Sequence, residues 1–117
     1  MQQEHRLNRN RQFSYVYRRG MKASNRDLTL LYVKNMQQRV GFSVSKKVGC
    51  AVVRNLIKRR LRECMRPRLL ELKQGMYVIV AHPSAKERSY AQLNKGLDAL
   101  LHRLALYRGE QMPPKAK

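Results

Sequence analysis

The sequence predicts an α+β fold, a small two-layer sandwich whose elements follow the order α-β-β-β-α-β-α. Apolar and small polar residues alternate over residues 40–45, which is the period of a half-buried strand. Apolar residues then recur every three or four positions over residues 53–64, which indicates an amphipathic helix. Residues 76–81 form an apolar run typical of a strand buried on both faces. We expect one domain over the 117 residues, with flexible ends at about 1–8 and 110–117.

The first expected element is a short helix over residues 10–19. Phe13, Val16 and Tyr17 follow the i, i+3, i+4 spacing of one helix face, and Gly20 stands where a glycine ends many helices. The two aromatic side chains either dock the helix on the sheet or form a surface on which unpaired bases stack. The residues alone favour docking.

Two or three strands are expected next. Residues 21–27 are predicted to form a turn or a short edge strand, and residues 28–34 a longer strand. Leu31 and Tyr32 belong to opposite faces of that longer strand, because successive side chains alternate. The strand that begins at Arg39 is expected to pair back on it as a hairpin.

The central helix is expected to end near Met65 or Arg66, because Pro67 cannot continue its hydrogen bonding. A further helical turn or two is predicted over residues 68–74. Gly75 ends that segment and begins the apolar strand.

A stripe of leucines marks the last expected helix. Its start is ambiguous, because Ser89 with Gln92 and Ser84 with Glu87 both form the pattern of a capping box. The helix is predicted to end near Arg108. The stripe comprises Leu93, Leu97, Leu100, Leu101 and Leu104.

The central helix carries a basic face opposite its apolar stripe. Arg54, Lys58 and Arg62 stand four residues apart in one row, with Asn55 and Arg59 beside them. No acidic residue occurs between positions 27 and 63, and Lys and Arg outnumber Asp and Glu by 26 to 7, a formal net charge of +19. Like charges at this spacing repel, and arginine binds phosphate through two parallel hydrogen bonds. The row is therefore interpreted as a nucleic-acid-binding face rather than as a solvated one.

The sequence carries no catalytic or metal-binding motif. Its seven acidic residues form no pair, and its three histidines have no metal-ligand spacing, so we expect neither a bound metal nor a cofactor. Cys50 and Cys64 lie about 20 Å apart along the helix and are expected to be free, largely buried thiols. The sequence shows no membrane-spanning run and no signal peptide, so a cytoplasmic protein is expected.

Residues 43–49 read SVSKKVG, and the helix continues with VRN at residues 53–55, KR at 58–59 and RE at 62–63. These motifs resemble the signature of the bacterial ribonuclease P protein subunit. The family's Arg-Asn-x-x-Lys-Arg-x-x-Arg run is matched from Arg54 to Arg62 without a gap. The resemblance spans residues from about 6 to 107, and it implies a ribosomal protein S5 domain 2-like fold.

The resemblance implies a role in removing the 5′ leader of precursor tRNA. In this family the RNA subunit holds the catalytic Mg²⁺ ions, so it implies a holoenzyme that requires Mg²⁺ and a protein without catalytic residues. It also implies that the partners of the protein are ribonuclease P RNA and the precursor tRNA leader. Apart from these RNAs the protein is implied to be a monomer, and it is implied to contact no membrane. The residues implied to face the RNA subunit are Arg54, Asn55, Lys58, Arg59, Arg62, Lys46 and Lys47. The residues implied to line the leader-binding cleft are Phe13, Tyr17, Arg18, Ser43, Ser45 and Tyr32.

Two positions depart from the family pattern. Leu31 stands where the family places an aromatic side chain facing the cleft, and Tyr32 follows one residue later, so which of them faces the cleft is left open. Cys50 replaces the usual Asn after the glycine and removes a polar group at the helix start. Two other functions stay open. They are a ribosomal or ribosome-associated RNA-binding protein without a part in tRNA processing, and a nuclease that acts without RNA.

Overall fold

The computed structural model describes residues 10–109, with side chains from Ser14 onward. The expected flexible ends and the side chain of Phe13 lie outside this range. The predicted α+β fold and the order α-β-β-β-α-β-α are confirmed, and two 3₁₀ helices are added. The elements are α1 (Asn10–Arg19), β1 (Met21–Ser24), β2 (Leu28–Lys34), β3 (Arg39–Val44), α2 (Ala51–Met65), η2 (Arg66–Glu71), β4 (Gly75–Ala81), η3 (Pro83–Glu87) and α3 (Tyr90–Arg103).

The four strands form one sheet in the order β1-β2-β4-β3. β2 runs antiparallel to both β1 and β4, and β3 runs parallel to β4. The predicted hairpin between β2 and β3 is therefore wrong. β4 lies between those two strands because it is apolar on both faces and is best shielded from water at the centre of the sheet.

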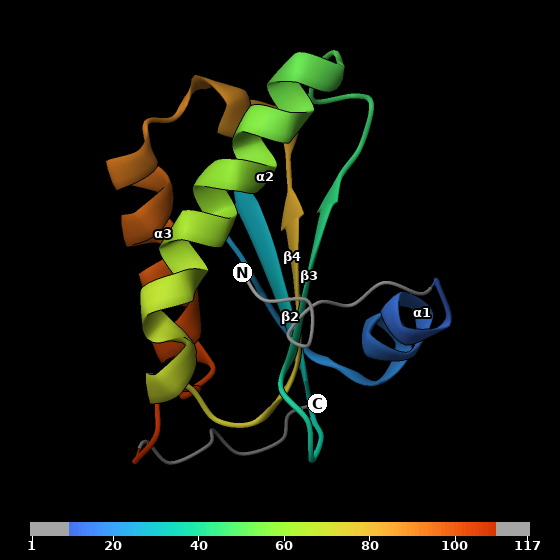
Figure 1. Ribbon diagram of the computed structural model, residues 1–117, viewed down its shortest axis with the longest axis vertical. Helices are drawn as coiled ribbons and strands as arrows, with labels where there is room; N and C mark the ends of the chain where they lie inside the picture. The colour runs from blue at the N-terminus through green and yellow to red at the C-terminus, as the bar shows by residue number, and fades with distance from the viewer. Residues whose placement is uncertain (1–9, 110–117) are drawn as a thin grey trace.

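The sheet separates two apolar clusters. α2 and α3 cover one face, and α1 lies against the other (Figure 1). Alternate residues of β2 and β4 face different helices, which explains the continuous apolar run of β4. The larger cluster includes Leu30, Tyr77, Ile79, Ile57, Leu61, Leu97 and Leu100. The smaller cluster consists of Val16, Leu31, Met76 and Val78.

The two helices on the larger cluster have clear boundaries. α2 ends at Met65, as Pro67 predicts, and the chain continues as η2. α3 begins after Ser89, whose side chain and that of Gln92 form the capping box, so the alternative start at Ser84 is wrong. α3 ends at Arg103 rather than near position 108, because Ala105 takes a φ of 55° that an α-helix cannot continue.

Candidate RNA-binding surface

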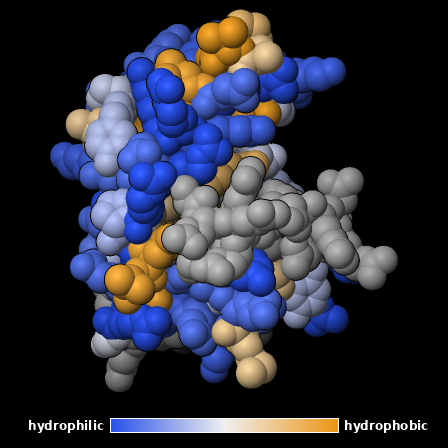
Figure 2. Space-filling view, viewed as in Figure 1, coloured by the Kyte–Doolittle hydropathy of each residue, from blue (hydrophilic) through white to orange (hydrophobic). Residues whose placement is uncertain are grey.

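One face of α2 carries the basic residues that the sequence singles out. Asn55 and Arg59 are exposed, and Arg54, Lys58 and Arg62 are half-buried beside them. Figure 2 shows mainly hydrophilic side chains over the visible surface of α2. Within residues 10–109 no ion pair involves the row of Arg54, Lys58 and Arg62. The row therefore keeps its positive charge available for an anionic partner.

Arg54 contains a polar atom that the described fold does not satisfy. Its Nε–H is buried and has no hydrogen-bond partner among the described residues. Leaving a buried donor unpaired costs about 1–3 kcal/mol. Arg54 is therefore packed partly into the fold and is not a purely solvated side chain.

The opposite face of α2 fixes the helix on the core. Ile57, Leu61, Cys64 and Met65 are buried there against the sheet and α3. Burying a large aliphatic side chain contributes about 1.5–3 kcal/mol, so this stripe holds the helix firmly. The same periodicity that buries the stripe turns the basic row toward solvent.

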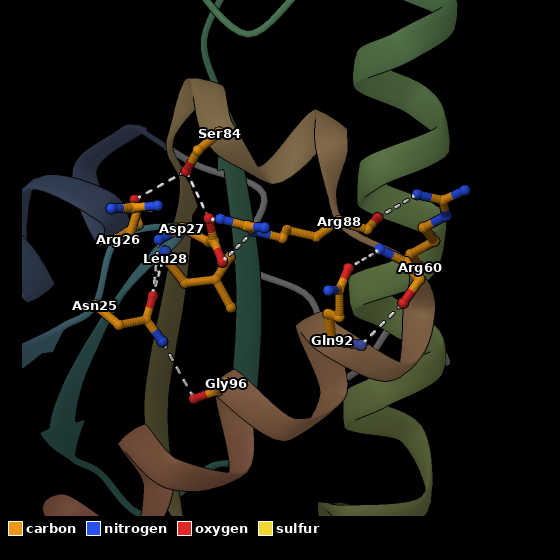
Figure 3. Close-up of polar contacts among 10 residues, drawn as sticks. Asn25, Arg26, Asp27, Leu28, Arg60, Ser84, Arg88, Gln92 and Gly96 are labelled. Atoms are coloured by element: carbon orange, nitrogen blue, oxygen red, sulfur yellow. Dashed lines mark hydrogen bonds and ion pairs between the residues drawn. The ribbon is translucent and has the colours of Figure 1, made fainter.

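A polar network ties α2 to the turn between β1 and β2 (Figure 3). Arg60 donates a hydrogen bond to the carbonyl of Arg88 at 2.8 Å, and the Arg88 Nε contacts both Asp27 carboxylate oxygens at 3.0 and 3.1 Å. The Ser84 hydroxyl donates to the same carboxylate at 2.6 Å. Partial burial acts to raise the pKa of Asp27, but the hydrogen bonds from Ser84 and Arg88 outweigh it and lower that pKa. Sequence analysis missed this network, because no local pattern links residues so far apart.

The turn between β3 and α2 places further predicted residues beside the first turn of the basic helix. The N–H of Val48 donates to the carbonyl of Ser45 at 3.1 Å, which closes the turn. Ser45, Lys46 and Lys47 are exposed on it, and Ser43 is half-buried on β3 just before it. Two lysines therefore extend the positive surface that Arg54 begins.

Helix α1 turns its described tyrosines to solvent. Val16 is fully buried in the smaller cluster, whereas Tyr17 and Tyr15 are 47% and 40% exposed. Val16 therefore docks the helix, and the alternative in which Tyr17 docks it is wrong. Tyr17 and the exposed Arg18 are accessible to a ligand, as is Tyr15, which sequence analysis did not single out.

Tyr32 lies on the opposite face of the sheet from α1, so its predicted place in the cleft is wrong. Its side chain is 3% exposed in the larger cluster, with its ring 4.9 Å from that of Tyr77. Its hydroxyl donates to the carbonyl of Gln74 at 2.6 Å, and burial raises its pKa. Leu31 instead lies under α1, because successive residues of a strand face opposite sides. On this face β2 therefore offers an aliphatic side chain where the family pattern has an aromatic one.

The two thiols have different surroundings. Cys50 occupies the N-cap position of α2 and is exposed, so the expectation that it is buried is wrong. It makes no side-chain capping bond, although the N–H groups of Val53 and Val52 lie close enough to lower its pKa. Cys64 is buried, and this burial raises its pKa to about 11.

Within residues 10–109 there is no group of three His, Cys, Asp or Glu side chains that could hold a metal ion. None of the helices in this range has the length and apolar character needed to cross a membrane.

Comparisons with known proteins agree with the motifs of residues 43–63. A family described as Ribonuclease P matches residues 1–105. The ribonuclease P protein component of Geobacillus thermodenitrificans (strain NG80-2) is 40% identical over 105 residues, covering 83% of this chain and 84% of its own length. The same component of Clostridium botulinum (strain Langeland / NCTC 10281 / Type F) is 41% identical over 108 residues, covering 89% of this chain and 97% of its own.

Solved structures show the same fold. The RNase P protein of Staphylococcus aureus superposes with a TM-score of 0.83 at 29% identity, covering 89% of this chain and 98% of that one. The RNase P protein of Thermotoga maritima superposes with a TM-score of 0.75 at 28% identity, covering 84% and 96%. The match over residues 1–105 and the identities of 40% and 41% confirm the resemblance drawn from the sequence: the chain belongs to the ribonuclease P protein family.

Proposed function

We propose that this chain is the protein component of a ribonuclease P holoenzyme and that it assists cleavage by binding RNA. The observation that carries the proposal is the row of Arg54, Lys58 and Arg62, which has no ion-pair partner within residues 10–109. Its helix is locked on the core by its other face, so the charges are held in position before the RNA arrives. The ligand of this row is the ribonuclease P RNA subunit.

The second ligand in this proposal is the 5′ leader of precursor tRNA. The exposed Tyr17 and Arg18 on α1, with Ser43 and Ser45 at the end of β3, supply an aromatic ring, a cation and hydroxyl groups. Exposed aromatic rings stack on unpaired bases, and cations follow the backbone of a single strand. Phe13 shares the face of Tyr17 by its spacing and joins this cleft through the family resemblance.

The chemistry of cleavage is assigned to the RNA subunit with its Mg²⁺ ions. The protein's part is to screen the repulsion between the phosphates of two RNAs, which lowers the Mg²⁺ concentration that the holoenzyme needs. In this proposal the protein acts in the cytoplasm and is a monomer apart from RNA.

The test is cleavage of precursor tRNA by ribonuclease P RNA at a Mg²⁺ concentration too low for the RNA alone. Adding the protein should restore production of the mature 5′ end, and the variant Arg54→Gln with Arg62→Gln should restore much less. A failure of the wild-type protein, together with tight binding to ribosomal RNA, would instead favour a ribosome-associated role.

Protein without RNA is the essential control for the assignment of catalysis. The control matters because one similar protein is described by an activity on RNA. This protein is a Staphylococcus aureus RNase P protein, solved as a mutant with defective mRNA degradation activity, with a TM-score of 0.83 and 29% identity to this chain. Purified wild-type protein, treated to remove RNA and supplied with Mg²⁺, should leave precursor tRNA intact. Cleavage that persists through this treatment would assign catalysis to the protein itself.

A further inference from the structure

We propose that a second phosphate-binding site lies at the edge of the sheet where β2 ends and β4 begins. This site holds the sugar-phosphate backbone of the RNA subunit. The site is a pocket of about 770 Å³ between the end of β2, the segment before β4 and the segment after α3. This inference rests on the proposed function and deepens it, because it adds a contact far from the start of α2.

The pocket collects positive charge from three distant segments. Lys34 ends β2, Lys73 precedes β4, and Arg108 follows α3. Among the described residues that line it, none is acidic. A pocket of this volume is in the usual range for small-molecule sites and accommodates one nucleotide. Cations that converge on a concave surface raise the local potential and favour an anionic group.

Hydrogen bonds hold the floor of the pocket in place. The hydroxyl of Tyr32 donates to the carbonyl of Gln74 at 2.6 Å, and the hydroxyl of Tyr77 donates to the carbonyl of Lys73. The N–H of Lys73 donates to the carbonyl of Leu106 at 2.8 Å. The loop that carries Lys73 is therefore fixed before any ligand binds, which reduces the entropy lost on binding.

Gly75 allows the loop to approach Tyr32. Its φ is +154°, and a Cβ added there would lie 2.4 Å from the ring of Tyr32. Only glycine tolerates both this backbone conformation and this contact. The aromatic floor and the loop of the pocket thus depend on a residue without a side chain.

Arg108 is oriented for a phosphate contact. Its N–H donates to the carbonyl of Glu71 at 2.8 Å, and its Nε donates to the carbonyl of Leu72 at 3.1 Å. Within the described range its two Nη groups make no hydrogen bond, so they can form the parallel pair that phosphate accepts. Met36 lines the same pocket and is 88% exposed, which provides an apolar surface for a sugar or a base.

The position of the pocket favours a large, folded RNA as its ligand. Lys34 pairs with Gly75 at one end of the sheet, and Val44 pairs with Ala81 at the other. These ends are about 20 Å apart, because each strand residue advances about 3.3 Å. A ligand that contacts both this pocket and the lysines that follow β3 must span that distance. A structured RNA subunit does so with a rigid backbone.

The experiment measures binding of the full chain to ribonuclease P RNA from the same organism over a range of salt concentrations. The pocket variant is Lys34→Gln with Arg108→Gln. The matched control is Lys86→Gln with Lys95→Gln, which removes the same charge from exposed lysines of η3 and α3. The pocket variant should lose about tenfold in affinity and about 1.4–1.8 units of the slope of log K against log salt, as for two lost phosphate contacts. The control should change the affinity by less than about twofold.

Equal losses in the pocket variant and the control would overturn the inference, because the effect would then come from net charge alone. A changed preference for leader-bearing substrate, with unchanged affinity for the RNA subunit, would also overturn it by assigning the pocket to precursor tRNA. Failure of the proposed function is distinguishable, since the wild-type protein itself would then bind ribonuclease P RNA no better than an unrelated structured RNA.

Discussion

Asp27 and Arg88 form an ion pair with an N–O distance of 3.0 Å, and the carbonyl of the same Arg88 accepts a hydrogen bond from Arg60 on the basic helix. The two side chains of the pair are only 19% and 28% exposed, so water screens them less than it screens a surface pair. A single residue thus joins the turn between β1 and β2 to the helix that carries the RNA-binding row. The ion pair thus helps to hold α2, the helix that carries the row, against the turn between β1 and β2.

Replacing Asp27 with Asn should lower the free energy of unfolding by about 1–3 kcal/mol, because the hydrogen bonds from Ser84 and Arg88 lose their charged acceptor. Chemical denaturation at pH 7 measures this change. The control is Glu87→Gln, which removes an exposed acidic side chain of η3 nearby. An equal loss in both variants would mean that the ion pair contributes nothing specific.

The contribution of Asp27 should depend on pH. Its pKa is lower in the folded protein than in the unfolded chain, so its stabilisation is complete above the unfolded value of about 4. The stabilisation is lost as the pH falls through the folded pKa. The difference in unfolding free energy between the wild type and Asp27→Asn should therefore shrink below about pH 4. A difference that stays constant down to pH 2 would contradict the assignment.

Replacing Arg54 and Arg62 with Gln should weaken binding to ribonuclease P RNA and reduce the salt slope by about 0.7–0.9 for each lost phosphate contact. Titrations at several salt concentrations measure both quantities, and the Lys86 and Lys95 pair is the matched control. Binding and slope that equal those of the wild type would mean that the row is only a solvated face.

Replacing Tyr17 with Ala should reduce the preference for leader-bearing over leaderless substrate by about 1–3 kcal/mol if a base stacks on its ring. Tyr15→Ala is the control, because Tyr15 is similarly exposed but lies about 200° around the helix from Tyr17. Competitive cleavage of the two substrates measures the preference. A preference that both variants leave intact would remove Tyr17 from the cleft.

Cys50 should react with iodoacetamide in the native protein, whereas Cys64 should not. Cys50 is exposed and its pKa is lowered, which increases its thiolate fraction at neutral pH, while Cys64 is buried with a pKa of about 11. Mass spectrometry of the alkylated peptides measures both rates. Bound ribonuclease P RNA should slow the reaction of Cys50, because the thiol lies between Lys47 and Arg54 in the chain. An unchanged rate would place the RNA away from this end of α2.

Local periodicity was sufficient to predict the helices and strands and the basic face of α2. The alternation of residues 40–45 and the spacing of Ile57, Leu61 and Cys64 indicate which side of each segment is buried, and this depends only on nearby residues. The row of Arg54, Lys58 and Arg62 follows from the same spacing. The formal net charge of +19 also indicated that the partner of the chain is a polyanion.

Only the tertiary structure decided which elements meet. It placed β4 between β2 and β3, it turned Leu31 rather than Tyr32 toward α1, and it joined Asp27, Arg60 and Arg88 in one network. It also gathered Lys34, Lys73 and Arg108 around one pocket. The contacts of the network and of the pocket join residues 28 to 74 positions apart, and their formation depends on how the whole chain buries its apolar faces. A local pattern carries no information about such distances, so the sequence determined the surfaces of each element and the packing determined the sites between them.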